Sequence, residues 1–133
     1  MISLDTNILV RLATNDDLPQ AQKALEVLKK LETGSRKALV LTEVLVELAY
    51  VMETIYSCTR DEVADFMEDL LAAPVFFLPD EDVVRKVLPV YRLQGEFVDH
   101  IIVARSRKNK AEQLFSFDRK LQKTYPGVVV GDL

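Results

Sequence analysis

Four carboxylates spread along the 133-residue chain are the residues whose type and position could do chemistry: Asp5, Glu47, Asp99 and Asp118. Two unit negative charges about 5 Å apart repel by roughly 3 kcal/mol at an effective dielectric constant of about 20. If the four converge, they stay ionised only beside a positive partner. Carboxylate oxygens suit a hard divalent cation, above all Mg²⁺ or Mn²⁺. Such ions activate water and stabilise displacement at a phosphodiester, so the set predicts metal-dependent hydrolysis.

Glu47 is the acid that a structural role explains least well. Its neighbours from Val44 to Met52 are all apolar, which predicts a largely buried helix. Glu43 lies one turn earlier, and like charges at this spacing weaken a helix. No lysine or arginine occurs between residues 38 and 58 to pair with either acid. Because a buried, unpaired carboxylate is costly, we expect this acidic stripe to face a wet cleft rather than the core.

The other acids have simpler structural explanations. Asp5 and Asp118 each follow a short apolar run, and a carboxylate there can cap the next helix. Glu96 and Asp99 fall in the first turn of a predicted helix, where a negative charge offsets the helix macrodipole. Each residue alone is ordinary, so capping and metal binding both remain open for them.

The elements that must position these acids alternate along the chain. Short apolar runs predict strands, and apolar residues at i, i+3 and i+4 predict helices between them. This alternation indicates an α/β fold with a parallel sheet covered on both faces, whose functional crevice lies at the carboxyl ends of the strands. Strands are predicted at 2–4, 38–41, 75–78, 114–117 and 128–130, and helices at 16–32, 42–56, 59–73, 80–92, 96–108 and from 118 onward.

Several residues mark the expected ends of these elements. Gly34 is expected to close one helix, and Thr59 with Glu62 forms a capping-box pattern that opens another. Pro74 ends that helix, and Pro89 is a possible kink in the following one. Residues 38–41 are also compatible with the entry to the next helix instead of a strand.

Length and composition indicate one soluble domain spanning residues 1–133. The single cysteine, Cys58, cannot form an internal disulfide, and the start of the chain does not resemble a signal peptide. The most hydrophobic stretch, residues 38–52, is too short to span a bilayer. We therefore expect a cytoplasmic protein without a membrane segment.

The distribution of charge is more informative than the net charge of −4, which argues against a generic nucleic-acid coat. Residues 61–99 contain ten acids and three bases, whereas residues 105–123 contain seven bases and two acids. Such asymmetry can place an acidic pocket beside a basic shoulder. Two solvated helix faces of opposite sign explain it equally well.

Four blocks of the sequence resemble the PIN domain, and within it the VapC ribonuclease toxins of toxin–antitoxin pairs. They follow the order and approximate spacing of the family on the predicted elements, so together they are far more specific than any one of them. The blocks are Leu4-Asp5-Thr6-Asn7, Val46–Met52, Phe97–Ile102 and Ser116-Phe117-Asp118-Arg119-Lys120-Leu121.

The resemblance implies a three-layer α/β/α fold with a central parallel sheet of four or five strands. It also implies that Asp5, Glu47, Asp99 and Asp118 hold Mg²⁺ or Mn²⁺ directly or through waters, with Asn7 and Ser116 orienting ligands or the attacking water from behind. Glu43 is an alternative to Glu47, and Glu96 stands where many relatives carry aspartate, so both are possible additional ligands.

The same resemblance implies hydrolysis of RNA that leaves a 5′-phosphate and a 3′-hydroxyl. It implies a homodimer and inhibition by a small VapB-like antitoxin that occludes the acidic cleft. Phosphates flanking the cleaved bond would meet basic side chains. These are Arg105, Arg107, Lys108, Lys110, Arg119 and Lys120.

Other classes of protein fit the residues less well. His100 is the only histidine, which excludes metal-free cleavage by a histidine pair. A haloacid-dehalogenase-like phosphatase needs a second aspartate where Asn7 stands, and the scattered glycines give no dinucleotide-binding turn. A receiver-like phosphoacceptor lacks a suitable lysine. The serious alternative is a PIN-like domain that binds RNA or a partner without cutting, although such degenerate members usually lose an acid.

Overall fold

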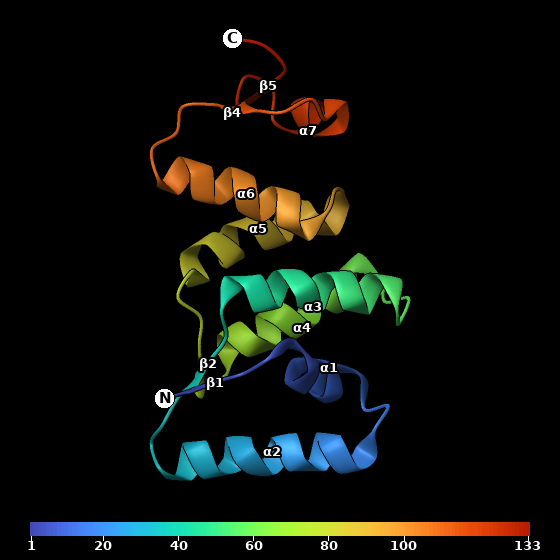
Figure 1. Cartoon of the computed structure of the whole chain (residues 1–133), viewed down its shortest axis with the longest axis vertical. Helices are drawn as coiled ribbons and strands as arrows, with labels where there is room; N and C mark the ends of the chain where they lie inside the picture. The colour runs from blue at the N-terminus through green and yellow to red at the C-terminus, as the bar shows by residue number, and fades with distance from the viewer. The chain divides into compact units, whose positions relative to one another are not determined.

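Strands and helices alternate along the whole chain, and every pair of hydrogen-bonded strands is parallel (Figure 1). The computed structural model describes all residues from Met1 to Leu133. It divides into an N-terminal unit, Met1–Glu81, and a C-terminal unit, Asp82–Leu133. The predicted α/β fold with parallel strands is confirmed. None of its helices is both long enough and apolar enough to cross a lipid bilayer.

The N-terminal unit contains a three-stranded parallel sheet in the order β1-β2-β3. Ile2 lies opposite Ala38, and Ala38 lies opposite Phe76 in the next strand. Helix α1 packs against α2 and α3, α3 packs against α4, and α4 contacts β3. The elements are β1 (Ile2–Ser3), α1 (Thr6–Thr14), α2 (Leu18–Thr33), β2 (Ala38–Leu39), α3 (Thr42–Thr54), α4 (Arg60–Ala72) and β3 (Phe76–Phe77).

The C-terminal unit contains a two-stranded parallel sheet, in which Leu114 lies opposite Val129. A small apolar cluster joins α6 and α7 to this sheet, with Val103, Leu121 and Val129 buried at its centre. The elements are α5 (Glu81–Leu93, which begins at the unit boundary), α6 (Phe97–Lys108), β4 (Leu114–Phe115), α7 (Arg119–Thr124) and β5 (Val129–Val130).

The predicted element boundaries hold to within a few residues wherever a capping residue marks them. Gly34 is the C-cap of α2, and Thr59 with Glu62 forms a complete capping box at the start of α4. Helix α4 ends at Ala72, before Pro74, and Pro89 lies inside α5. The expected central sheet of four or five strands does not form as one sheet, because three strands pair in the N-terminal unit and two pair in the C-terminal unit.

The first helix predicted from the sequence begins at residue 16, and the structure has an additional helix before it, α1, capped by Asp5. The buried residues of α1 are Thr6, Leu9 and Val10, which follow the i, i+3, i+4 spacing of one helix face. A nine-residue helix is marginal in isolation. Its contacts with α2 and α3 therefore decide its conformation.

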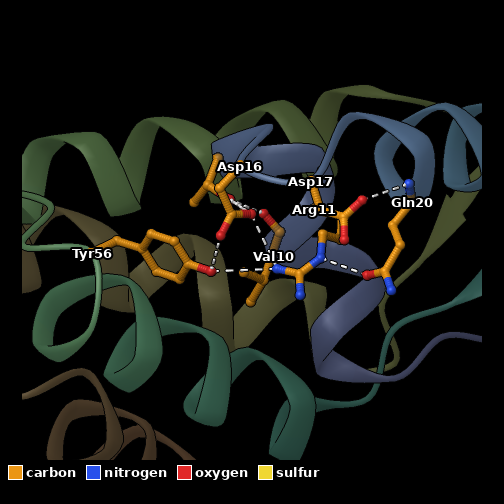
Figure 2. A network of polar contacts seen from close by, with 7 residues as sticks. Val10, Arg11, Asp16, Asp17, Gln20 and Tyr56 are labelled. Carbon is orange, nitrogen blue, oxygen red and sulfur yellow. Dashed lines mark hydrogen bonds and ion pairs between the residues drawn. The ribbon is translucent and has the colours of Figure 1, made fainter.

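A polar network fixes the far end of α1 (Figure 2). Arg11 on α1 donates from Nη1 to Asp16 Oδ1 at 3.1 Å and from Nε to Gln20 Oε1 at 2.7 Å. The Tyr56 hydroxyl, from the segment after α3, donates to Asp16 Oδ2 at 2.6 Å and accepts from Arg11 Nη1 at 3.3 Å. The Thr14 hydroxyl also donates to Asp16, at 3.0 Å. The network therefore connects α1, the turn into α2 and the end of α3.

Substituting Asp16→Asn is expected to lower the melting temperature at neutral pH, by an amount that shrinks in acid. The hydrogen bond from Tyr56 is the main cause that lowers the pKa of Asp16 below its ordinary value of 3.8. A carboxyl whose folded pKa is lowered stabilises the fold above its unfolded pKa and loses that contribution as the pH falls through the folded pKa. Thermal melts from about pH 7 to about pH 3 measure this.

The exposed acid Asp69 of the same unit is the control for this experiment. The Asp69→Asn variant should follow the wild type at every pH. A gap between wild type and Asp16→Asn that stayed constant, or widened, as the pH fell would contradict the assignment.

Candidate active site

Asp5 lies where β1 passes into α1, and it caps that helix. Its Oδ1 accepts a hydrogen bond from the Thr6 backbone N–H at 2.8 Å, and the side chain is exposed. The Thr6 hydroxyl beside it is buried without a hydrogen-bond partner, and Asn7 is exposed in the same turn. A buried hydroxyl without a partner marks a place where a bound water or ion would complete the hydrogen bonding.

Glu43 and Glu47 lie on the exposed side of α3. The expectation that this helix is buried nearly all round is wrong, because its buried residues form one stripe and Tyr50 is 66% exposed. The acidic stripe nevertheless faces solvent rather than core, as the cost of an unpaired buried charge requires. The Thr42 hydroxyl donates to Asp80 Oδ2 at 2.7 Å and fixes the start of the helix. The buried residues of α3 are Thr42, Leu45, Leu48, Ala49 and Met52.

Asp118 occupies the equivalent place in the C-terminal unit, after β4 and at the N-cap of α7. Its Oδ1 accepts from the Leu121 backbone N–H at 3.0 Å. Ser116 supports it, because the Ser116 hydroxyl accepts from the Asp118 backbone N–H at 3.1 Å. The Ser116 carbonyl in turn accepts from Gln122 Nε2 at 2.7 Å. The hydroxyl two residues before the aspartate therefore holds the backbone of the acid in place.

Asp99 lies in the first turn of α6, and the structure shifts its pKa. Burial is the main cause that raises the pKa of Asp99, and the negative charges of Glu96 and Asp118 raise it further, while His100 acts in the opposite direction. Glu96 is the N-cap of α6, although its side chain does not cap the helix by a hydrogen bond. Glu96 and Asp118 therefore each lie within electrostatic reach of Asp99.

These carboxylate donors fit a hard divalent cation in chemistry. No group of three or more histidine, cysteine, aspartate or glutamate side chains is arranged to hold a metal ion within either unit. Asp5 and Glu47 belong to the N-terminal unit, and Asp99 and Asp118 belong to the C-terminal unit. All four are carboxylates, and the repulsion among the acids near Asp99 is the kind that Mg²⁺ or Mn²⁺ relieves.

The basic residues separate into two groups. Arg119 and Lys120 are exposed directly after Asp118, in the first turn of α7. Arg105, Arg107 and Lys108 occupy the last turn of α6, at the opposite end of that helix from Asp99. There a basic residue also complements the helix macrodipole.

A cavity of about 450 Å³ lies in the C-terminal unit, apart from the acids. Lys108 reaches Asp82 Oδ1 at 3.2 Å, and both residues line the cavity. None of Glu96, Asp99 and Asp118 lines it. The cavity is therefore not the candidate active site. Its polar lining includes Asp82, Lys86, His100, Arg107, Lys108 and Tyr125.

Two side chains near the acids were missed at the level of sequence. In the sequence, His100 serves only to exclude a histidine pair and Tyr125 is not singled out, yet their side chains are hydrogen-bonded to each other at 2.6 Å. The sequence signal for His100 was a polar residue, directly after Asp99, at a position that the helical periodicity predicts to be buried. The Thr6 hydroxyl is a third such residue.

Comparison with known proteins identifies the family. The sequence matches the PIN domain family over residues 2–126, so the chain belongs to that family. It is also similar to a VapC ribonuclease of Aquifex aeolicus (strain VF5), with 24% identity over 121 residues. That alignment covers 90% of this chain and 89% of the relative. The resemblance noted in the sequence is confirmed.

The capping role of Asp118 can be separated from its charge. Asp118→Ala removes the hydrogen bond to Leu121 and should lower the free energy of unfolding by about 1 kcal/mol. Asp118→Asn should be as stable as the wild type or more stable, because asparagine caps helices equally well and does not repel Asp99. Urea unfolding of the three proteins tests this. Equal losses in both variants would show that the cap contributes nothing.

Proposed function

We propose that this protein is a Mg²⁺- or Mn²⁺-dependent endoribonuclease, the toxin of a VapBC-type toxin–antitoxin pair. The observation that carries the proposal is that the PIN domain match spans residues 2–126 and hence includes Asp5, Glu47, Asp99 and Asp118. The similarity to a VapC ribonuclease over nine-tenths of the chain supports it.

The four carboxylates would hold the metal ion, directly or through waters, with Glu43 and Glu96 as possible additional ligands. When bound there, Mg²⁺ or Mn²⁺ supplies an activated water and neutralises charge at the scissile phosphate. Asp5 and Asp118 each use one oxygen for a helix cap, which fixes the direction of the carboxylate. Asn7 and Ser116 would orient ligands or the attacking water. Water adds to phosphorus, the bond to O3′ breaks, and O3′ takes a proton.

The basic side chains would contact the RNA backbone. Arg119 and Lys120 are placed for phosphates next to the cleaved bond, because they follow Asp118 directly. Arg105, Arg107 and Lys108 would meet phosphates farther along the strand. The family suggests two protein partners, a VapB-like antitoxin and a second copy of this chain. We expect the protein to be cytoplasmic.

Binding without cleavage is the alternative function, and it makes a different prediction. A PIN-like domain that only binds RNA or a partner would retain its affinity for RNA in EDTA and would release no product with any divalent ion. The presence of an acid at all four positions favours cleavage.

Asp5→Asn is expected to reduce RNA cleavage at least about 100-fold. Loss of a residue that only hydrogen-bonds to a metal ligand already costs up to about 100-fold, so loss of a ligand should cost at least as much. Asparagine keeps the cap on α1 and removes one charged ligand. The matched control is Asp17→Asn, since Asp17 caps α2 in the same unit by accepting from the Gln20 backbone N–H at 3.1 Å. Gel assays with Mg²⁺ or Mn²⁺ measure the rate. Full activity of Asp5→Asn, or cleavage in excess EDTA, would refute the mechanism.

Mn²⁺ is expected to raise the melting temperature of the wild type. At a concentration ten times the dissociation constant, binding stabilises the folded state by about 1.4 kcal/mol, or a few degrees. Asp99→Asn should lose most of this shift, whereas Glu112→Gln, which changes an exposed acid of the same unit, should keep it. Equal shifts in wild type and Asp99→Asn would place the ion elsewhere.

A further inference from the structure

The His100 side chain is buried and makes two hydrogen bonds. It is 1% exposed, its Nδ1 lies 2.6 Å from the Tyr125 hydroxyl, and its Nε2 lies 2.7 Å from the Gln94 carbonyl oxygen. A carbonyl only accepts, so Nε2 carries the proton. In the neutral ring, Nδ1 therefore accepts from the Tyr125 hydroxyl. The two rings also contact each other edge to face, with centroids 5.7 Å apart.

The turn before α6 is built around the same imidazole. Gly95 has φ of +80°, a conformation that favours glycine, and a Cβ added there would lie 2.6 Å from His100 Nε2. Both the backbone conformation and the lack of a side chain are therefore required for the turn to approach the ring. We call this set of contacts among Gln94, Gly95, His100 and Tyr125 the His100–Tyr125 bridge.

The bridge joins the segments that carry Glu96, Asp99 and Asp118 in the C-terminal unit. His100 directly follows Asp99, and the Gln94–Gly95 turn directly precedes Glu96. Tyr125 is the C-cap residue of α7, and Asp118 is the N-cap residue of the same helix. The bridge thus fastens the end of α7 to the first turn of α6 and so fixes the position of Asp118 relative to Asp99.

Such a restraint has a physical reason. Glu96 and Asp118 both repel Asp99. Without a restraint, the segments that carry these acids would lower their electrostatic free energy by moving apart. The apolar contacts of α7 resist this motion weakly, because that helix has six residues and one buried side chain, Leu121. The partly buried hydrogen bond from Tyr125, the C-cap residue of α7, to His100 of α6 adds a directional contact beside the apolar cluster.

We propose that His100 and Tyr125 are positioning residues, which hold Asp99 and Asp118 at the separation that a shared divalent cation requires. Neither residue touches the reacting atoms. This inference rests on the proposed function, because it assigns the two residues a role at the same site.

The test compares Tyr125→Phe with Thr124→Val. The first variant removes only the hydroxyl that donates to His100. The second removes a hydroxyl one residue away, which donates to the Lys120 carbonyl within α7. A neutral hydrogen bond of ordinary strength predicts that Tyr125→Phe binds Mn²⁺ about three- to tenfold more weakly, measured by electron paramagnetic resonance titration. Its kcat on RNA at subsaturating Mn²⁺ should fall by a similar factor with KM for RNA unchanged, and Thr124→Val should match the wild type.

A metal-free measurement separates this inference from the proposed function. Amide hydrogen exchange at Asp99, His100 and Leu121 should be about three- to tenfold faster in Tyr125→Phe than in wild type or Thr124→Val. A wild type that neither binds Mn²⁺ nor cleaves RNA would refute the proposed function, and these exchange rates would still decide whether the bridge positions the acids. Unchanged exchange at these amides would overturn the inference. So would a Tyr125→Phe protein of lowered melting temperature whose Mn²⁺ affinity and kcat equal those of the wild type.

Discussion

Repulsion among carboxylates that the fold holds near one another is the constraint on which the candidate site depends. Asp99 is half-buried and lies within electrostatic reach of Glu96 and Asp118, and all three effects raise its pKa. Two features of the fold offset this repulsion. Asp99 and Glu96 lie at the start of α6, and Asp118 at the start of α7, where the positive end of the helix macrodipole stabilises a negative charge. That stabilisation is modest, and the negative charge that remains is one that the proposed divalent cation would offset.

Capping and metal binding are compatible roles for the same carboxylate. Asp5 and Asp118 each follow a strand and accept a backbone N–H with one oxygen. A strand that ends in an aspartate cap places the acid at the carboxyl end of the strand, where ligands bind in parallel α/β sheets. The cap holds the side chain in one orientation, and a carboxylate has further lone pairs for an ion. The local explanation from the sequence and the functional one therefore describe the same geometry.

Local signals in the sequence predicted much of the fold. Capping residues located the ends of α2 and α4, and the spacing of Glu96 and Asp99 on one helix turn predicted their proximity. The position of α1 depends on contacts with α2 and α3, so a nine-residue segment with few local signals was missed. The burial of α3 was overestimated, because the apolar content of a helix does not show which of its faces other elements cover. Tyr50 is apolar in part but remains exposed. Asp99 and Asp118 lie at the starts of two different helices, so their spacing in the sequence could not predict that they lie near each other. The resemblance to a family supplied that proximity as an expectation.

The type of residue that holds α6 and α7 together matters for a cation site. A lysine or arginine paired directly with Asp99 would relieve the repulsion and hold the helices, but it would also occupy the place and the charge that an ion needs. The His100 and Tyr125 side chains act through a hydroxyl, an imidazole and a backbone carbonyl, so they restrain the segments by hydrogen bonds that do not involve the carboxylates. The hydrogen bond between them involves the buried side of α6, where His100 is 1% exposed. A restraint of this kind keeps the repulsion in place, and a bound cation then gains the full free energy of relieving it.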